Sequence, residues 1–175
     1  MKRLWAPWRK GYLLGEPAGP KPEGCIFCAL PALDEDQHRA NLLLSVGRRA
    51  FLILNRYPYN SGHLMAVPRL HAADPSELSP PDYWVLAEVL RRATRSLRET
   101  LRPQGVNVGM NLGEAAGAGI AEHCHYHLVP RWVGDTNFLP VVGETKVLSI
   151  GLADSYDQLV PVMRDLVPTV EEELA

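Results

Sequence analysis

The chain has no long apolar run and no surplus of positive charge. Of its 175 residues only 22% are charged and the formal net charge is −2, so the basic surface typical of general nucleic-acid binding is missing. No apolar stretch approaches the roughly 20 residues of a membrane-spanning helix. Met1-Lys2-Arg3 is not followed by the apolar segment of a secretory signal. We therefore expect no membrane and no nucleic-acid partner.

Cysteine is also scarce, and its count argues against a disulfide framework. There are three cysteines, an odd number, and two of them form the pair Cys25-x-x-Cys28. This usage favours a reduced, cytoplasmic setting with a metal or redox pair. No βαβ pattern surrounds the pair, which argues against a thioredoxin-like site. If the pair binds zinc, histidines must supply the other ligands, and the candidates are His38, His63, His71 and His123.

No internal repeat and no low-complexity linker divides the chain, so we expect one domain. The predicted order of strands, helix, strands and helix, with short links among the strands, indicates an α+β fold with an antiparallel sheet. Residues 1–24, rich in Pro and Gly, are predicted to form an extended arm; residues 25–142 the catalytic domain; and residues 143–175 a helical extension packed on it. A long amphipathic helix is predicted to begin at Ser79 and to end before Pro103. The predicted strands are 41–46, 50–55, 63–68, 106–112, 121–130 and a shorter one at 138–142, and the C-terminal helix is predicted at 155–174.

Three of the six histidines alternate along one predicted strand, at His123, His125 and His127. Alternation places the three rings on one face. Neighbouring rings are then about 6.6 Å apart and the outer two about 13 Å apart, whereas zinc–nitrogen bonds are about 2.0–2.1 Å long. One metal cannot hold all three rings. The spacing therefore favours a divided strand, in which one end serves a metal and the rest serves acid–base or nucleophilic chemistry.

A small-residue loop, Asn111–Gly119, precedes the histidines. Its backbone N–H groups can approach an anion closely. A nucleophilic histidine beside such a loop suits attack on phosphorus, where charge on the non-bridging oxygens must be stabilised. The alternative is a plain glycine-rich turn between two strands.

The motif His123-Cys-His-Tyr-His-Leu-Val129 resembles the signature of the histidine triad (HIT) family, His-φ-His-φ-His-φ-φ with φ apolar. The stretch Asn55-Arg-Tyr-Pro-Tyr-Asn-Ser-Gly-His-Leu-Met-Ala-Val-Pro68 is similar to a second family motif, in the right order. The resemblance covers roughly Cys25 to Trp132. It implies a HIT-like fold with about five antiparallel strands, one long helix and a C-terminal helix, a homodimer, and nucleotide substrates.

The resemblance also implies roles for individual residues. His125 would attack the α-phosphorus and carry a nucleotidyl group, with His127 as the second catalytic residue at the phosphate or the leaving group. Asn55 would lie by the ribose and Asn111 by the phosphate. The full predicted substrate-binding set is Asn55, His63, Asn111, Gly117, Gly119 and His127. The predicted zinc ligands are Cys25, Cys28, His71 and His123.

One departure from the family pattern bears on the reaction. Many family hydrolases carry a water-positioning glutamine four residues before the first triad histidine, and Gly119 stands there instead. With the N-terminal Leu4-Trp5-Ala6-Pro7-Trp8-Arg9, this resembles the bacterial diadenosine tetraphosphate phosphorylases. We expect phosphorolysis to ADP and ATP, with inorganic phosphate and possible help from a divalent cation. The alternatives are hydrolysis of dinucleoside polyphosphates or nucleoside phosphoramidates, and a non-catalytic nucleotide-binding module.

Overall fold

A computed structural model describes residues 24–143 and 145–175 of the chain. The arm predicted over residues 1–24 lies outside the described residues, apart from Gly24. The division predicted between 142 and 143 stays a prediction. The longer elements are β1 (Leu43–Val46), β2 (Ala50–Leu54), β3 (Leu64–Pro68), α4 (Pro80–Leu101), β4 (Gly105–Met110), β5 (Tyr126–Arg131), α6 (Leu152–Met163) and α7 (Leu166–Glu173). The short ones are α2 (Ile26–Ala29), α3 (Glu35–His38), α5 (Leu139–Gly143) and the 3₁₀ turns at Leu30–Ala32, Pro75–Glu77 and Glu114–Ala116.

The five strands form one antiparallel sheet in the order β1-β2-β3-β5-β4. This confirms the predicted α+β class and sheet type. The first three strands and β4 begin and end within two residues of their predicted bounds. In β2 and β3 every residue is buried, because helices and the chain N-terminal to β1 enclose them. The sheet therefore offers a rigid platform for the histidines, which lie on β5 and just before it.

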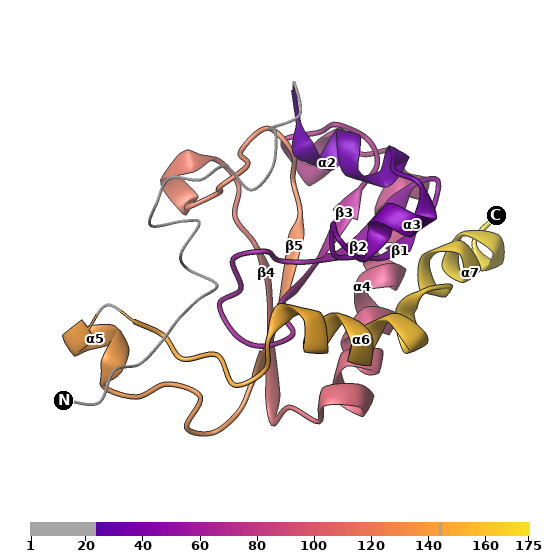
Figure 1. Ribbon diagram of the computed structural model, residues 1–175. Helices are drawn as coiled ribbons and strands as arrows, with labels where there is room; N and C mark the ends of the chain where they lie inside the picture. Colours follow the sequence, from indigo (N-terminus) through magenta and orange to yellow (C-terminus); the bar gives the residue numbers. More distant parts are fainter. Residues whose placement is uncertain (1–23, 144) are drawn as a thin grey trace.

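Helix α4 packs against β2, β3 and β5 and supplies much of the core (Figure 1). The Ser79 hydroxyl accepts a hydrogen bond from the Asp82 N–H, and two prolines occupy the first turn, which confirms the predicted start. Arg102, in the left-handed conformation at φ 48°, ends the helix. Its buried stripe consists of Val85, Leu86, Val89, Ala93 and Leu97.

The C-terminal region forms two helices, α6 and α7, instead of the one helix predicted at 155–174. Both pack against α4 and β1. The break falls between Arg164 and Asp165 and not at a proline, since Pro161 lies inside α6. Pro168 has no N–H to donate to the Arg164 carbonyl. The buried Ser45 hydroxyl donates to that carbonyl at 2.8 Å and accepts from Val167 N–H at 3.1 Å, which stabilises the break.

Two strand predictions were wrong in extent or kind. Strand β5 begins at Tyr126, so residues 121–125 of the predicted strand lie outside it. There the Cys124 N–H donates to the Ala72 carbonyl, beyond the end of β3, and the chain departs from the sheet toward Cys25 and Cys28. The strand predicted at 138–142 is the helix α5, which stands apart from the sheet (Figure 1). The Asn137 side chain accepts from the Leu139 N–H and starts this turn.

None of the helices among the described residues has both the length and the apolar character needed to cross a membrane.

Candidate functional site

His127 and His63 form a hydrogen-bonded pair, because of the register between β3 and β5. Met65 lies directly opposite His127, and His63 precedes Met65 by two residues, so the two rings are diagonal neighbours on one face. The His63 Nε2 and His127 Nδ1 atoms are 2.9 Å apart. Tyr59 stacks on both rings, with centroids 4.8 Å from His63 and 5.8 Å from His127. His63 is fully buried, so only His127 faces a cleft.

A backbone donor sets which ring nitrogens carry protons in this pair. The Tyr59 N–H donates to His63 Nδ1 at 3.0 Å, and an N–H group can only donate. The proton of neutral His63 is therefore on Nε2, which donates to His127 Nδ1. Neutral His127 must then carry its own proton on Nε2. The arrangement makes the free nitrogen of His127 a hydrogen-bond donor.

His125 has the opposite arrangement. Its Nδ1 lies 2.9 Å from the carbonyl oxygen of His123, and a carbonyl can only accept, so Nδ1 carries the proton. Nε2 then keeps its lone pair. The ring is 5% exposed and lies 4.8 Å from the His127 ring, centroid to centroid. A neutral imidazole with a free Nε2 beside an N–H donor is the arrangement of a nucleophile next to a group that can stabilise an anion.

Burial keeps these rings neutral at pH 7. Desolvation, followed by the nearby His127 and His125, lowers the pKa of His63 to about 3. Desolvation and the neighbouring His125 lower the pKa of His127 to about 4. Desolvation also lowers the pKa of His125, against the opposing effect of its bond to the His123 carbonyl. Each ring therefore keeps the single proton that its hydrogen bonds assign.

The side chains of Cys25, Cys28, His71 and His123 converge, with their ligand atoms all within 4.8 Å of one another. His123 Nδ1 lies 3.3 Å from Cys25 Sγ and 3.7 Å from Cys28 Sγ, and His71 Nδ1 lies 3.3 Å from Cys28 Sγ. Tetrahedral zinc with the usual bond lengths separates its ligands by roughly 3.3–3.8 Å. The cluster therefore fits zinc, and it contains the four residues predicted as ligands.

The hydrogen bond on the far side of His123 supports the same conclusion. Its Nε2–H donates to the Pro68 carbonyl at 2.9 Å, which leaves the Nδ1 lone pair directed at the two cysteines. Metal-bound histidines commonly donate their other N–H to a carbonyl in this way. The other candidate ligands lie elsewhere, since His63 pairs with His127 and His38 bonds the Leu33 carbonyl.

Phe27 connects this cluster to the nucleophile. It lies in α2, between the two cysteines, and is 2% exposed. Its ring centroid is 5.0 Å from that of His125 and 5.5 Å from that of His123, in edge-to-face contacts. A metal ion that fixes the two cysteines would therefore also hold the apolar ring of Phe27 against His125.

A cleft of about 430 Å³ opens beside His127, between β4, β5 and the chain after β5. Gly109 of β4 lies directly opposite His127, and Gly105 lies opposite Arg131. Directly opposed residues share a face, so the missing side chains leave room above the sheet there. A Cβ at Gly109 would meet nothing within 4 Å. Asn111 also lines this cleft, and its predicted contact with phosphate stays a prediction.

The remaining residues predicted to bind substrate are less closely associated with the cleft and the histidines. The Asn111 amide donates to the Gly117 carbonyl at 3.4 Å, which ties the two ends of the glycine loop together. Position 117 favours glycine, because its φ of +88° is a backbone conformation that other residues rarely adopt. Gly119 is exposed, with open space around its Cα. Asn55 is half-buried, and its side chain accepts from the Tyr57 N–H in a turn, outside the residues that line the cleft.

Sequence reasoning missed several residues at the site. Arg131 follows His127 by four residues on the same strand, so the alternation that grouped the histidines could have included it. Phe27 lay inside the cysteine motif. Tyr59 and Lys146 come from segments outside the sheet, and only the folded chain brings them to the cleft.

Comparison with known proteins identifies the family of this chain. Residues 41–133 match the HIT domain model. A relative named AP-4-A phosphorylase, from Mycobacterium tuberculosis, is 37% identical over 160 residues, which cover 89% of this chain and 80% of the relative. An uncharacterised HIT-like protein from Saccharolobus solfataricus is 28% identical over 115 residues, 66% of this chain and 79% of the relative.

Solved structures agree on the fold. A zinc-bound histidine triad family protein from Mycobacterium smegmatis superposes with a TM-score of 0.62 at 24% identity, covering 86% of this chain and 97% of its own. A hypothetical histidine triad nucleotide-binding protein from Sulfolobus tokodaii gives 0.61 at 22% identity, covering 85% and 95%. At such identities the likeness establishes the architecture.

Proposed function

The chain belongs to the histidine triad family and is an enzyme of that family. We propose that it phosphorolyses diadenosine tetraphosphate to ADP and ATP, through a nucleotidyl group carried on His125. The observation that carries the proposal is the tautomer of His125, whose Nδ1–H is held by the His123 carbonyl and whose Nε2 is free. The 37% identity to a named AP-4-A phosphorylase supports the substrate class.

In the first step, His125 Nε2 attacks the α-phosphorus. A nitrogen–phosphorus bond forms, and the bond from that phosphorus to the bridging oxygen breaks, so that ATP leaves with the bonding electron pair. The Nδ1 proton stays with His125 and is stabilised by the His123 carbonyl, since the ring becomes cationic. Phe27 limits water access to this ring.

In the second step, an oxygen of inorganic phosphate attacks the same phosphorus. The nitrogen–phosphorus bond breaks, ADP is released, and His125 Nε2 regains its lone pair. The sum is diadenosine tetraphosphate plus phosphate giving ADP plus ATP, with one proton released near neutral pH. Two in-line displacements give net retention of configuration at phosphorus.

His127 stabilises the oxygen on which charge develops. Its Nε2–H is available because His63 donates to its Nδ1. With a pKa of about 4 it is a hydrogen-bond donor in the free protein, not an acid. The negative charge of a bound polyphosphate would raise that pKa and favour proton transfer. We infer that His63 acts through His127, because it is fully buried behind that ring.

Zinc would be held by Cys25, Cys28, His71 and His123, and would supply structural stabilisation. It would hold α2, and with it Phe27, against His123 and His125. No chemical step passes through it. Asn55, Asn111 and the Gly117–Gly119 loop remain proposed contacts to ribose and phosphate, and a divalent cation would help neutralise the substrate.

We also propose a cytoplasmic homodimer. Strand β1, at one edge of the sheet, packs against α6 and α7, whereas β4 at the other edge has no further strand among the described residues. An open edge with exposed Val108 is suited to pairing with a second copy. Light scattering should give about twice the monomer mass of 19.4 kDa, and Val108→Arg should reduce it to one monomer mass.

The decisive experiment supplies diadenosine tetraphosphate with and without inorganic phosphate. ADP plus ATP that appears only with phosphate supports the proposal, whereas AMP formed regardless of phosphate supports the rival hydrolase. His125→Ala should abolish turnover with an unchanged circular dichroism spectrum. A fully active His125→Ala protein would refute the assigned nucleophile, and nucleotide binding without any turnover would favour a non-catalytic module.

A further inference from the structure

The cleft beside His127 carries positive charge that the two chemical steps above do not use. Arg131 and Lys146 line it, and no carboxylate is among its lining residues. His127 adds no charge at pH 7, because its pKa is about 4. The cleft therefore combines open volume, cationic side chains and direct continuity with a catalytic histidine.

Arg131 is fixed in place. Its Nε and Nη2 donate to Asp135 at 2.7 and 2.9 Å, and its Nη1 donates to Asn107 at 2.8 Å. Asp135 also accepts from the buried Asn60 amide at 2.8 Å. Arg131 therefore presents its remaining N–H groups from a rigid position, although Asp135 offsets most of its charge.

Lys146 is different, because its ammonium makes no close ion pair with a described residue, although its charge helps to lower the pKa of the nearby Asp135 carboxyl. It is the only lysine in the part of the chain that the structure describes, and no ion pair or hydrogen bond to its ammonium occurs within that part. It is half-buried on the chain between α5 and α6. Further along, the Ser61 hydroxyl bonds both the N–H and the carbonyl of Ile150, which holds this segment against the sheet.

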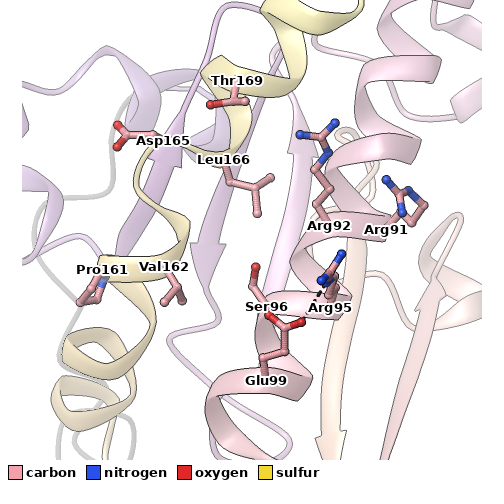
Figure 2. A pocket seen from close by; sticks show the side chains of 10 residues that line it. All are labelled: Arg91, Arg92, Arg95, Ser96, Glu99, Pro161, Val162, Asp165, Leu166 and Thr169. Atoms are coloured by element: carbon pink, nitrogen blue, oxygen red, sulfur yellow. Dashed lines mark hydrogen bonds and ion pairs between the residues drawn. The ribbon is translucent and has the colours of Figure 1, made fainter.

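A second, larger groove provides a contrast. It lies between α4 and the α6–α7 junction, has a volume of about 480 Å³, and is lined by Arg91, Arg92 and Arg95 (Figure 2). These arginines are paired with carboxylates of Glu88, Glu173 and Glu99, and Asp165 also lines the groove. Its charges are therefore internally balanced. Of these two sites, the cleft at His127 is the one with a cation, Lys146, that makes no close ion pair with a described residue.

The geometry points to a phosphate subsite formed by Lys146 and Arg131, and we propose that it binds the phosphate groups on the far side of the attacked phosphorus. This rests on the proposed two-step reaction. In an in-line displacement the leaving group departs opposite to His125, and the second nucleophile must enter from that same side. One subsite therefore serves two sources of phosphate: the chain of the departing nucleotide and then the free inorganic ion. Lysine suits both, as a mobile point charge.

The test compares Lys146→Met with Lys146→Arg, which keeps the charge, and with Arg95→Met, which removes a cation from the other groove. Single-turnover release of ATP without phosphate measures the departing nucleotide, and the KM for inorganic phosphate in steady state measures the acceptor. We expect Lys146→Met to slow the single-turnover release of ATP, and to raise the KM for inorganic phosphate, each by about tenfold or more. Arg95→Met should stay within about threefold of the wild type, and Lys146→Arg should lose less than Lys146→Met in both measurements, because it keeps the charge.

A binding measurement keeps the proposal testable apart from turnover. Inorganic triphosphate, titrated into each folded variant by calorimetry, should bind Lys146→Met about tenfold more weakly than the wild type, while AMP binding stays unchanged. If Lys146→Met changes only the rate of ATP release, or only the KM for inorganic phosphate, the proposal of one shared subsite is overturned. Unchanged triphosphate affinity would overturn the subsite altogether. A wild type that binds triphosphate through Lys146 without turning over diadenosine tetraphosphate would instead refute the proposed function.

Discussion

At the scale of single residues, the chemistry depends on which nitrogen of each histidine carries a proton. Two backbone groups decide this, the Tyr59 N–H for His63 and the His123 carbonyl for His125. Backbone groups cannot change from donor to acceptor, so these assignments hold whatever the pH above the ring pKa values. The result is one free lone pair, on His125, next to one free N–H, on His127.

Gly119 is the residue at which we expect the choice of acceptor to be adjustable. It is exposed and a side chain there would meet nothing within 4 Å, so Gly119→Gln should fold normally. An amide at this position could hold water near the phosphorus. An amide can orient water by hydrogen bonding but does not take its proton, so we expect the ratio of AMP to ADP formed from diadenosine tetraphosphate at fixed phosphate to rise by only about tenfold, less than a general base contributes.

The matched control is Gly119→Ala, which adds a side chain without an amide and should keep the wild-type product ratio. Chromatographic separation of the nucleotides gives the ratio directly. If Gly119→Gln and Gly119→Ala give the same products, Gly119 does not govern the acceptor.

At the scale of elements, two short pieces of structure owe their positions to tertiary contacts. Helix α2 has four residues and no side-chain cap, and a helix of that length is unstable alone in water. The turn after β1 depends on α7, where the buried carboxylate of Glu171 accepts from the Arg48 and Arg49 N–H groups at 2.9 and 2.7 Å. Both pieces should therefore respond strongly to the loss of one partner.

Under the proposal that Cys25, Cys28, His71 and His123 hold zinc, removal of the metal should release α2 and Phe27. We expect a chelator, or Cys28→Ser, to lower the free energy of unfolding by about 3 kcal/mol, since the burial of a phenylalanine is worth roughly that much. Thermal unfolding by circular dichroism and metal content by mass spectrometry would measure the two effects. Cys124→Ser is the control, because Cys124 is buried outside the cluster and should keep one zinc per chain. Equal zinc content in Cys28→Ser and the wild type would contradict the assigned ligands.

Glu171→Ala should leave two backbone N–H groups without an acceptor. We expect it to lower the free energy of unfolding by about 1–3 kcal/mol. Glu171→Gln keeps one acceptor oxygen and should lose less. Urea unfolding of the three proteins measures the difference, and identical midpoints would show that α7 does not stabilise this turn.

At the scale of the whole molecule, the buried histidines make stability depend on pH. The folded-state pKa of His63 is about 3 and that of His127 about 4, both below the ordinary 6.5. The unfolded chain therefore binds more protons between pH 6.5 and 3, and the free energy of unfolding must fall as the pH falls through that range. Above pH 6.5 these two groups contribute no slope.

For His63 alone, the loss by pH 4.5 is on the order of 2–3 kcal/mol. Urea unfolding at pH 7.0 and 4.5 measures it. His63→Gln has no titrating ring there and should lose correspondingly less between the two pH values, whereas metal release affects both proteins alike. An equal loss in the two proteins would contradict the buried, neutral state of His63.

Much of this molecule was predictable from local pattern. Short apolar runs bounded by turn residues predicted β2 and β3, and the Ser79 cap with its apolar stripe predicted α4, because such runs and capping are local properties. The same local reasoning was wrong at residues 121–125, where the chain departs from the sheet, and at residues 138–142, where an asparagine side chain starts a helical turn.

From an assumed strand spacing, the sequence by itself predicted that the three histidines do not serve one metal. Residues 121–125 lie outside the strand, but His123 does lie at the cysteines while His127 pairs with His63. The sequence also predicted the family and the four residues of the Cys/His cluster that could hold a metal ion. Only the tertiary structure decided which ring nitrogens are free, that Phe27 supports His125, and that Lys146 reaches the cleft. The reason is physical: these facts depend on distances between residues far apart along the chain, such as the 98 positions between Cys25 and His123, and folding alone sets such distances.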